Sequence, residues 1–226
     1  MIVRNAHLVN TGMPPKLKNA AANDFFFLPR RDSVRLVETV VELCKTRLPD
    51  KMGIPAEELQ VLTPTRRGDA GTRLLNFAHD LQKFSAPPKP GKQERRFGEL
   101  IFREGDRVMQ TRNDYDVVWQ KEDGTAGTGI FNGDVGKIAK IDPSGELLEI
   151  VFDDRTATYT SDMLAELDMA YAMTVHKAQG SEYRAVILAA WSGSQLLLTR
   201  SILYTAITRA RELFIIVGSR HAVQTG

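Results

Sequence analysis

Four short apolar runs constrain most strongly what this chain can fold into. They are "FFFLP" at 25–29, "LQVLTP" at 59–64, "AVILAAW" at 185–191 and "LFIIVG" at 213–218. An apolar run of this length bounded by turn residues predicts a buried strand. Amphipathic helical patterns lie between the runs. This alternation of strand and helix predicts an α/β domain with a parallel sheet.

Capping signals mark where the predicted helices begin. Asp32 and Ser33 offer N-cap oxygens to a helix whose apolar residues recur at three- and four-residue spacing, and Thr199 offers one to a later helix. Glycines open a further amphipathic pattern over residues 66–84. We expect these helices to pack their apolar faces on the sheet.

The middle of the chain has a different pattern. From Glu94 to about Leu167 the segments are short and separated by turn residues. Asn132–Gly133, Pro143–Gly145 and Asp153–Asp154 stand where hairpin turns are expected. Because α/β patterns lie on both sides, the sequence predicts a small antiparallel barrel or meander inserted into the α/β domain.

Composition excludes several classes of protein. The 226 residues carry 30 Lys plus Arg and 28 Asp plus Glu, a formal charge of +2, so any nucleic-acid site must depend on local placement of charge. Cys44 is the one cysteine, which excludes a disulfide framework. No apolar run approaches the roughly 18 residues of a membrane span, and no signal-peptide pattern is present. We therefore expect a cytoplasmic protein.

Two stretches concentrate chemically diverse side chains. In "TVHKAQGSE" (174–182) a hydroxyl, an imidazole, an ammonium, an amide and a carboxylate fall within nine positions. A weak apolar face before it predicts a helix that Gly180 ends in a left-handed conformation, placing Gln179, Ser181 and Glu182 at the carboxyl edge of the sheet. The alternative is that these are solvated helix residues and a surface charge.

The second stretch is "LYTAITRAR" (203–211). Arg209 and Arg211 are predicted in the last turn of a helix, where a cation interacts favourably with the helix dipole. A guanidinium fixed there can instead bind a phosphoryl group through two parallel hydrogen bonds. The sequence alone leaves both roles open.

Together the two stretches resemble motifs V and VI of superfamily 1 helicases, most closely those of the RecD-like branch, the exodeoxyribonuclease V alpha-subunit type. Ala178 replaces the serine usual in that branch. "QVLTPTRRGDAGTRLLN" is similar to its motif IV, "FREGDRVMQTRN" to the lead into an inserted SH3-like barrel, and the opening residues to the linker that leaves the first motor domain. The resemblance covers essentially the whole chain.

The resemblance implies a RecA-like second motor domain with helices on both faces of a parallel sheet. No P-loop pattern G-x-x-x-x-G-K-[ST] is present, so the first motor domain is expected on another part of a longer polypeptide. The implied layout has four parts: a linker at 1–22, the motor domain at 23–113 and 168–226, and the SH3-like barrel at 114–167.

The resemblance also implies residue roles at a nucleotide. ATP lies between two motor domains, and the first supplies the P-loop and the Mg²⁺ site. Arg209 corresponds to an arginine finger, and Glu182 to the residue that accepts a hydrogen bond from the ribose. Gly180 and Gln179 lie beside it, and either Arg66 or Arg67 of motif IV adds a contact to the γ-phosphate. No metal site is predicted in this chain, because its four histidines lack metal-site spacing.

Other residues are implied in holding single-stranded DNA. Thr174 and His176 suit phosphate contacts, and Thr63 and Asn113 are candidates for which an ordinary turn role is equally expected. Lys137, Lys140 and Phe131 in the barrel form either a DNA-binding surface or a solvated strand face.

The implied function is an ATP-dependent DNA helicase of repair and recombination that moves 5′ to 3′ on single-stranded DNA and acts at duplex junctions, alone or with nuclease and helicase subunits. One alternative is a non-catalytic DNA-binding clamp module, and another is the helicase half of a conjugative relaxase. On its own the 226-residue chain is expected to hydrolyse no ATP.

Overall fold

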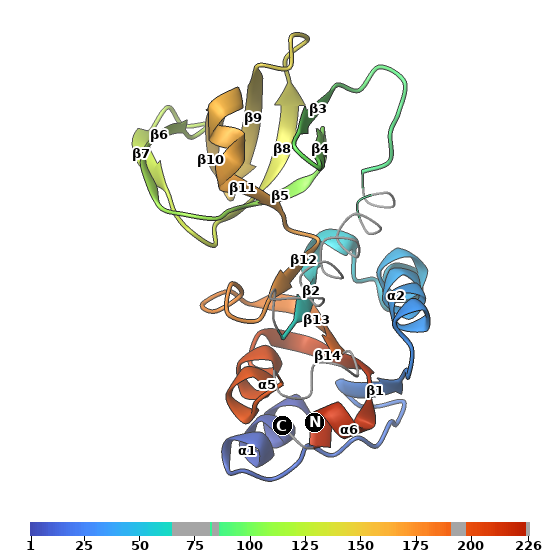
Figure 1. The fold of residues 1–226 in the computed structure, drawn as a ribbon. Coiled ribbons are helices and arrows are strands. Elements are labelled where there is room, and N and C mark those ends of the chain that lie inside the picture. The colour runs from blue at the N-terminus through green and yellow to red at the C-terminus, as the bar shows by residue number, and fades with distance from the viewer. Residues whose placement is uncertain (65–81, 83–85, 191–197, 225–226) are drawn as a thin grey trace. The chain divides into compact units, whose positions relative to one another are not determined.

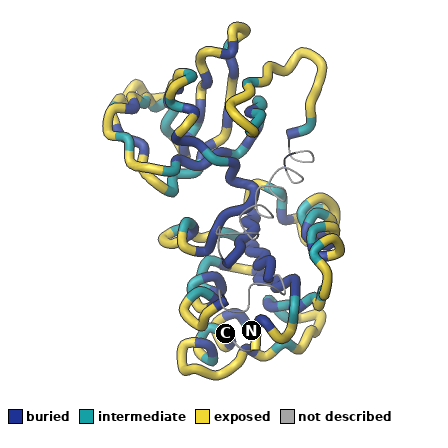
Figure 2. Tube along the Cα trace, viewed as in Figure 1, coloured by how far each residue is buried: buried dark blue, intermediate teal, exposed yellow. Residues whose placement is uncertain are grey.

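The computed structural model describes residues 1–64, 82, 86–190 and 198–224. They form two compact units (Figure 1). The α/β unit comprises Met1–Phe77 and Ala172–Gly226, and the β unit comprises Ala78–Tyr171. Each unit has its own buried core, as Figure 2 shows. None of the described helices has the length and apolar character that a membrane crossing requires.

A parallel sheet of five strands organises the α/β unit, in the order β1-β14-β13-β2-β12. Its strands are β1 (Phe25–Pro29), β2 (Leu59–Thr63), β12 (Ala172–Thr174), β13 (Tyr183–Ala190) and β14 (Ala210–Gly218). The central strands β13, β14 and β2 are buried along most of their length. The parallel α/β sheet predicted from the four apolar runs is confirmed.

Helices cover both faces of this sheet (Figure 1). On one face α2 (Ser33–Glu42) packs on β13 and β14, and on the other α5 (Arg200–Ile207) packs on the same strands. The predicted caps are confirmed: the Asp32 carboxylate accepts from the Arg35 amide at 2.8 Å, and the Thr199 hydroxyl from the Ile202 amide at 3.4 Å. Further helical segments of this unit are η1 (Leu43–Arg47), α3 (Leu48–Met52), η2 (Ala56–Glu58) and α6 (Arg220–Gln224). The helix predicted over 66–84 lies outside the described residues apart from Gln82.

Residues 1–22, predicted to be a linker, are instead an integral part of the α/β unit. Ile2–Asn10 forms helix α1, which packs against α5. The buried Asn5 amide pairs with the Lys16 backbone, and the Asn19 amide pairs with both backbone groups of Phe27. Because β1 is the edge strand of the sheet, Asn19 satisfies main-chain groups that would otherwise be unpaired.

The helix predicted before Gly180 is wrong. Ala172–Thr174 is strand β12, whose Thr174 lies opposite Thr63 of β2, and residues 175–180 form turns. Every residue from Met169 to Val175 is buried, so no exposed helical face exists in this run. An unbroken buried run fits a strand covered on both faces better than an amphipathic helix. Gly180 does adopt a positive φ of 92°, as predicted.

Antiparallel strands build the β unit. Seven form one sheet in the order β11-β5-β8-β9-β10-β6-β7, and β3 pairs with β4 separately. The strands are β3 (Glu94–Phe97), β4 (Leu100–Arg103), β5 (Arg107–Gln110), β6 (Asp114–Gln120), β7 (Ala126–Ile130), β8 (Val135–Ile141), β9 (Leu147–Phe152), β10 (Arg155–Thr160) and β11 (Leu167–Met169), with the 3-10 helix η3 (Ser161–Glu166) before β11.

Two of the three predicted hairpin turns are confirmed. Pro143–Gly145 joins β8 to β9, and Asp153–Asp154 joins β9 to β10. Asn132–Gly133 instead connects β7 to β8, which do not pair, and its Gly133 amide donates to the Gln110 carbonyl at 2.9 Å. The true β6–β7 hairpin turns at Lys121–Thr125.

The β unit is wider than the 114–167 predicted for the insertion. Strand β5 pairs with both β8 and β11, so residues before 114 belong to the sheet. The buried Asp106 carboxylate accepts from the Arg103 amide, the Gln82 side chain and the Tyr171 hydroxyl, each at 2.7 Å. This one carboxylate therefore joins the two ends of the unit.

Candidate functional site

The polar residues of the 174–182 stretch lie at two different edges of the parallel sheet. Thr174 and Thr63 are register partners at the carboxyl ends of β12 and β2. Glu182 directly precedes β13 and Arg209 directly precedes β14, whose first residues are paired with each other. Ser181 and Glu182 are therefore at the amino edge, not at the carboxyl edge predicted. The prediction failed because it did not include β12 as a strand of the sheet.

The connection between β12 and β13 spans the depth of the sheet. Leu188 pairs with Leu62, so the position level with Thr63 is six residues along β13 from Tyr183. At about 3.3 Å per residue this separation is about 20 Å. Residues 175–182 therefore link the carboxyl edge, at Thr174, to the amino edge, at Glu182.

Backbone hydrogen bonds hold this connection in consecutive turns. The Thr174 carbonyl accepts from the amides of Lys177 (3.0 Å) and Ala178 (3.3 Å), and the Ala178 carbonyl accepts from the Ser181 amide at 3.1 Å. Ala178 is fully buried. His176, Gln179, Gly180 and Glu182 are exposed. The turns thus present those four residues to solvent on a fixed backbone.

Arg209 is anchored at the amino edge by its guanidinium. Its Nε donates to the Thr205 carbonyl (3.2 Å), Nη1 to the Ser181 carbonyl (2.9 Å) and Nη2 to the Thr208 hydroxyl (3.2 Å). A guanidinium has five N–H groups, and these three bonds leave two of them, one on each terminal nitrogen. The side chain is half-buried, so part of it is open to solvent at this edge.

Helix α5 ends earlier than predicted. Its last residue is Ile207, so Arg209 follows the helix and Arg211 lies exposed in β14. The Arg209 guanidinium still reaches back to the Thr205 carbonyl in the last helical turn, where a cation is favourable. The structural role that the sequence suggested for Arg209 is thus present, and it is compatible with a ligand contact through the two remaining N–H groups.

Glu182 shares this edge with Arg209. The residues on either side of Glu182 both bond to Arg209: the Ser181 carbonyl accepts from its guanidinium, and the Tyr183 amide donates to its carbonyl at 2.8 Å. The Glu182 carboxylate is exposed and has no ion pair within the described residues. This edge therefore presents an anionic hydrogen-bond acceptor, the Glu182 carboxylate, next to a cationic donor, the Arg209 guanidinium.

Arg184 is a structural residue of the same edge that sequence reasoning missed. Its guanidinium bonds to Glu58 at 2.9 Å, to Glu212 at 2.8 Å and to the Gly53 carbonyl at 3.2 Å. These two carboxylates raise the pKa of Arg184 further above its usual value. Arg184 ties the starts of β13 and β14 to the segment before β2. Arg184, Glu58 and Glu212 are brought together only by the register of the strands. The sequence alone therefore gave no indication that they form ion pairs.

The other predicted site residues have different surroundings. Thr63 is fully buried and Thr174 is 8 % exposed, whereas His176 is exposed. Asn113 belongs to the β unit, where its side-chain carbonyl accepts from the Asn132 amide at 3.0 Å, the turn role that was one of its two predictions. Arg66 and Arg67 lie outside the described residues.

The basic and aromatic residues of the β unit are exposed. Lys137 and Lys140 are exposed on β8. Phe131 is 40 % exposed and packs edge-on against Tyr115, with ring centroids 5.6 Å apart. This aromatic pair is therefore available for stacking on a planar ligand.

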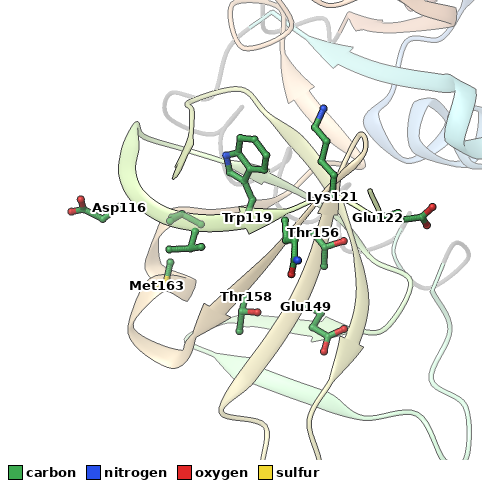
Figure 3. Close-up of a pocket in the computed structure, with 11 residues that line it drawn as sticks. Asp116, Trp119, Lys121, Glu122, Glu149, Thr156, Thr158 and Met163 are labelled. Carbon is green, nitrogen blue, oxygen red and sulfur yellow. The ribbon is translucent and has the colours of Figure 1, made fainter. Parts of the chain in front are cut away.

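A groove of about 590 Å³ lies on strands β6, β9 and β10 of the β unit (Figure 3). Three carboxylates line it, those of Asp116, Glu122 and Glu149. Lys121, also in its wall, is paired with Asp154 at 2.7 Å. This groove is therefore net negative and unsuited to a phosphate backbone. Nowhere in the described part of the chain do three or more His, Cys, Asp or Glu side chains gather as a metal site.

Comparison with protein families matches both units. The family described as ATP-dependent RecD-like DNA helicase SH3 domain matches residues 75–152, and the UvrD-like helicase C-terminal domain matches residues 169–217. The chain contains a RecD-like helicase SH3 domain and a UvrD-like helicase C-terminal domain. The SH3 match begins near the start of the β unit, and the UvrD-like match contains both stretches that resemble motifs V and VI.

Two curated relatives agree with the domain matches. The ATP-dependent RecD2 DNA helicase of Deinococcus radiodurans is 37 % identical over 166 residues, 74 % of this chain and 21 % of that protein. The RecBCD enzyme subunit RecD of Mycolicibacterium smegmatis is 32 % identical over 120 residues, 53 % of this chain and 19 % of that protein. A Bacteroides Pif1 helicase structure aligns over 95 % of this chain and 48 % of its own at 15 % identity, with a TM-score of 0.49. The chain thus spans about a fifth of the length of these curated relatives.

Replacing Gly180 with alanine is expected to lower the free energy of unfolding of the UvrD-like domain by about 1–2 kcal/mol, because its φ of 92° disfavours a side chain. A Cβ built there meets nothing within 4 Å, so the cost is conformational rather than steric. Urea denaturation followed by circular dichroism measures it. Gly180→Asn is the control and should lose less, because asparagine tolerates positive φ better. Equal stability of all three proteins would contradict the assigned conformation.

Proposed function

We propose that this chain is the second motor domain, with its SH3 insertion, of an ATP-dependent DNA helicase that moves on single-stranded DNA. The observation that carries the proposal is the anchored Arg209 guanidinium at the amino edge of the sheet, with two N–H groups remaining, beside the exposed Glu182. A binding module has no need of a guanidinium held ready for a phosphoryl group. A nucleotide-completing domain does.

In the proposed nucleotide site each residue has one role. Arg209 acts in trans on the phosphoryl group held by the first motor domain and stabilises the charge that develops there. Glu182 accepts a hydrogen bond from a ribose hydroxyl, and Gly180 and Gln179 let the nucleotide approach the turn closely. Arg66 or Arg67 adds a second phosphate contact.

The charges of this edge also fit a divided site for Mg²⁺. In the described part of the chain the edge offers Glu182 as a single unpaired carboxylate, whereas Mg²⁺ is usually held by carboxylates together with substrate phosphates. Its protein ligands would therefore come from the first motor domain. When bound, Mg²⁺ neutralises phosphate charge, and this chain contributes the guanidinium.

The opposite edge of the sheet supplies the proposed DNA contacts. His176 is exposed and can meet a phosphate or a base, and Thr174 lies two residues before it at the end of β12. Thr63 is fully buried beside Thr174, so it supports this edge rather than touching the strand. In the SH3 domain, Asn113, Lys137, Lys140 and Phe131 are proposed to contact single-stranded DNA at a duplex junction.

The geometry also supports a route for coupling the two sites. Residues 175–182 join the edge with the DNA contacts to the edge with the nucleotide contacts, about 20 Å apart by strand rise. A movement of Glu182 and Ser181 toward a bound nucleotide would therefore be transmitted to His176 through a short, hydrogen-bonded connection. A series of turns makes this link, in place of the helix that the sequence predicts.

The names of two relatives support helicase activity and assembly with other subunits. One is named as a DNA helicase and the other as a subunit of the RecBCD enzyme. We propose 5′ to 3′ movement, a cytoplasmic location, and either independent action or assembly with nuclease and helicase subunits. A non-catalytic clamp remains the second candidate function, favoured only if the nucleotide edge proves inert.

The proposal is tested with the full-length polypeptide that contains this chain. We expect DNA-stimulated ATP hydrolysis and ATP-dependent unwinding of a forked duplex with a 5′ single-stranded tail. The isolated 226-residue chain is expected to hydrolyse no ATP, because it lacks a P-loop. Turnover by the isolated chain, or DNA binding without any turnover by the full-length polypeptide, would refute the helicase assignment. DNA binding without turnover would support the clamp.

A further inference from the structure

The Thr208 side chain sits between Arg209 and the end of helix α5. Its hydroxyl donates to the Thr205 carbonyl at 2.9 Å and accepts from Arg209 Nη2 at 3.2 Å. A hydroxyl has one hydrogen and two lone pairs. Because the Thr205 carbonyl takes the hydrogen, a lone pair is directed to the guanidinium.

The three anchors of Arg209 differ in where they come from. The Thr205 carbonyl and the Thr208 hydroxyl belong to the segment that carries Arg209, and the Ser181 carbonyl belongs to the turn beside Glu182. Main-chain carbonyls cannot be removed by a side-chain change. Of the three anchors, the Thr208 hydroxyl is the one that belongs to a side chain, so a substitution can remove it.

We propose that Thr208 is a positioning residue for Arg209, fixing the guanidinium so that its two remaining N–H groups face the transferred phosphoryl group. When a nucleotide draws the Ser181–Glu182 turn toward itself, the contacts within the α5 segment hold the guanidinium in place. An arginine side chain has many rotamers, and each fixed contact reduces the fraction that is misplaced at the moment of reaction. The inference rests on the proposed function.

Replacing the hydroxyl with a methyl group should leave the fold intact. Valine has the shape of threonine, and Thr208 is half-buried beside a cavity of about 330 Å³ between α1 and α5 that Val3 and Tyr204 also line. The Thr205 carbonyl keeps a donor after the change, because Arg209 Nε also bonds to it at 3.2 Å. The group that loses its partner is Arg209 Nη2, and this is the contact that the substitution is meant to remove.

The test measures steady-state, DNA-stimulated ATP hydrolysis by the full-length polypeptide. Thr208→Val should lower kcat about tenfold, the value of roughly one hydrogen bond to a charged group, with the KM for ATP within about threefold. Thr208→Ser keeps the hydroxyl and should restore most of the rate. Thr46→Val is the matched control, because the exposed Thr46 hydroxyl also bonds to a helical carbonyl, that of Glu42, at 2.8 Å. It should match the wild type.

Each outcome separates this inference from the proposed function. Wild-type turnover in Thr208→Val, together with an inactive Arg209→Ala, overturns the positioning role and leaves the helicase proposal standing. Normal turnover in Arg209→Ala overturns both. Equal losses in Thr208→Val and Thr208→Ser, or a fall in kcat that follows a fall in Tm, show a structural role and also overturn the inference. If Thr208→Val does not fold, Thr208→Ala gives the same comparison.

Discussion

Arg209→Ala is expected to lower DNA-stimulated ATP hydrolysis by the full-length polypeptide about 10³- to 10⁵-fold, the range typical of an arginine finger. Nucleotide binding should largely persist, because the proposed P-loop and Mg²⁺ contacts lie on another domain. The physical reason is that the two remaining N–H groups of Arg209 act on charge that develops only in the transition state. Initial rates and the equilibrium binding of a fluorescent ATP analogue measure the two quantities separately.

Two variants make this prediction specific. Arg209→Lys keeps the positive charge but has no planar fork, so it cannot bond to the Thr205 and Ser181 carbonyls and to a phosphoryl group at once, and it should recover little activity. Arg211→Ala removes an exposed arginine two residues away in β14 and should match the wild type. Wild-type turnover by Arg209→Ala would remove the helicase assignment for this site.

The strands were predictable because a strand that is buried on both faces has an uninterrupted apolar run in its sequence. The runs at 25–29, 59–64, 185–191 and 213–218 each overlap a strand of the parallel sheet. The strand at 172–174 was not found, because three residues in a longer buried run have the same apolar character as a helix segment. Without that strand, the edge at which Glu182 lies could not be derived.

The candidate site was predictable only as a set of residues. The resemblance to helicase motifs selected Gly180, Glu182 and Arg209, and the structure brings them to one edge of the sheet. The anchors of Arg209 depend on where α5 ends and on which carbonyls then face the guanidinium. The hydrogen-bond distances from Arg209 to its anchors follow from the strand register and from the length of α5. Neither can be read from the spacing of residues in the sequence.

Removing the buried Asp106 carboxylate of the SH3 domain is expected to cause the largest loss of stability. Asp106 is fully buried and accepts three hydrogen bonds of 2.7 Å, from the Arg103 amide, Gln82 and the Tyr171 hydroxyl. Asp106→Ala leaves these donors in a buried site without their acceptor, at about 1–3 kcal/mol for each group that finds no other partner. We expect a total loss of about 3–5 kcal/mol in the free energy of unfolding, measured by urea denaturation.

The control for this change also tests the charge of the carboxyl group. Asp106→Asn keeps an oxygen for the two N–H donors, and the Tyr171 hydroxyl can rotate to accept from the new amide, so the loss should be only about 1 kcal/mol near neutral pH. A loss as large as that of Asp106→Ala would show that the negative charge itself is required.

Burial raises the pKa of Asp106, and the three hydrogen bonds only partly offset this effect. The folded state therefore binds a proton more tightly than the unfolded state. The contribution of this carboxyl group to stability is fully present below the unfolded pKa of about 4 and is lost as the pH rises through the higher folded value. The stability of the wild type relative to Asp106→Asn should accordingly fall as the pH is raised from 4 through that value and then level off. If the stability of the wild type relative to Asp106→Asn instead rises over this interval, the site stabilises the ionised carboxylate. The three hydrogen-bond donors would then outweigh the cost of burial.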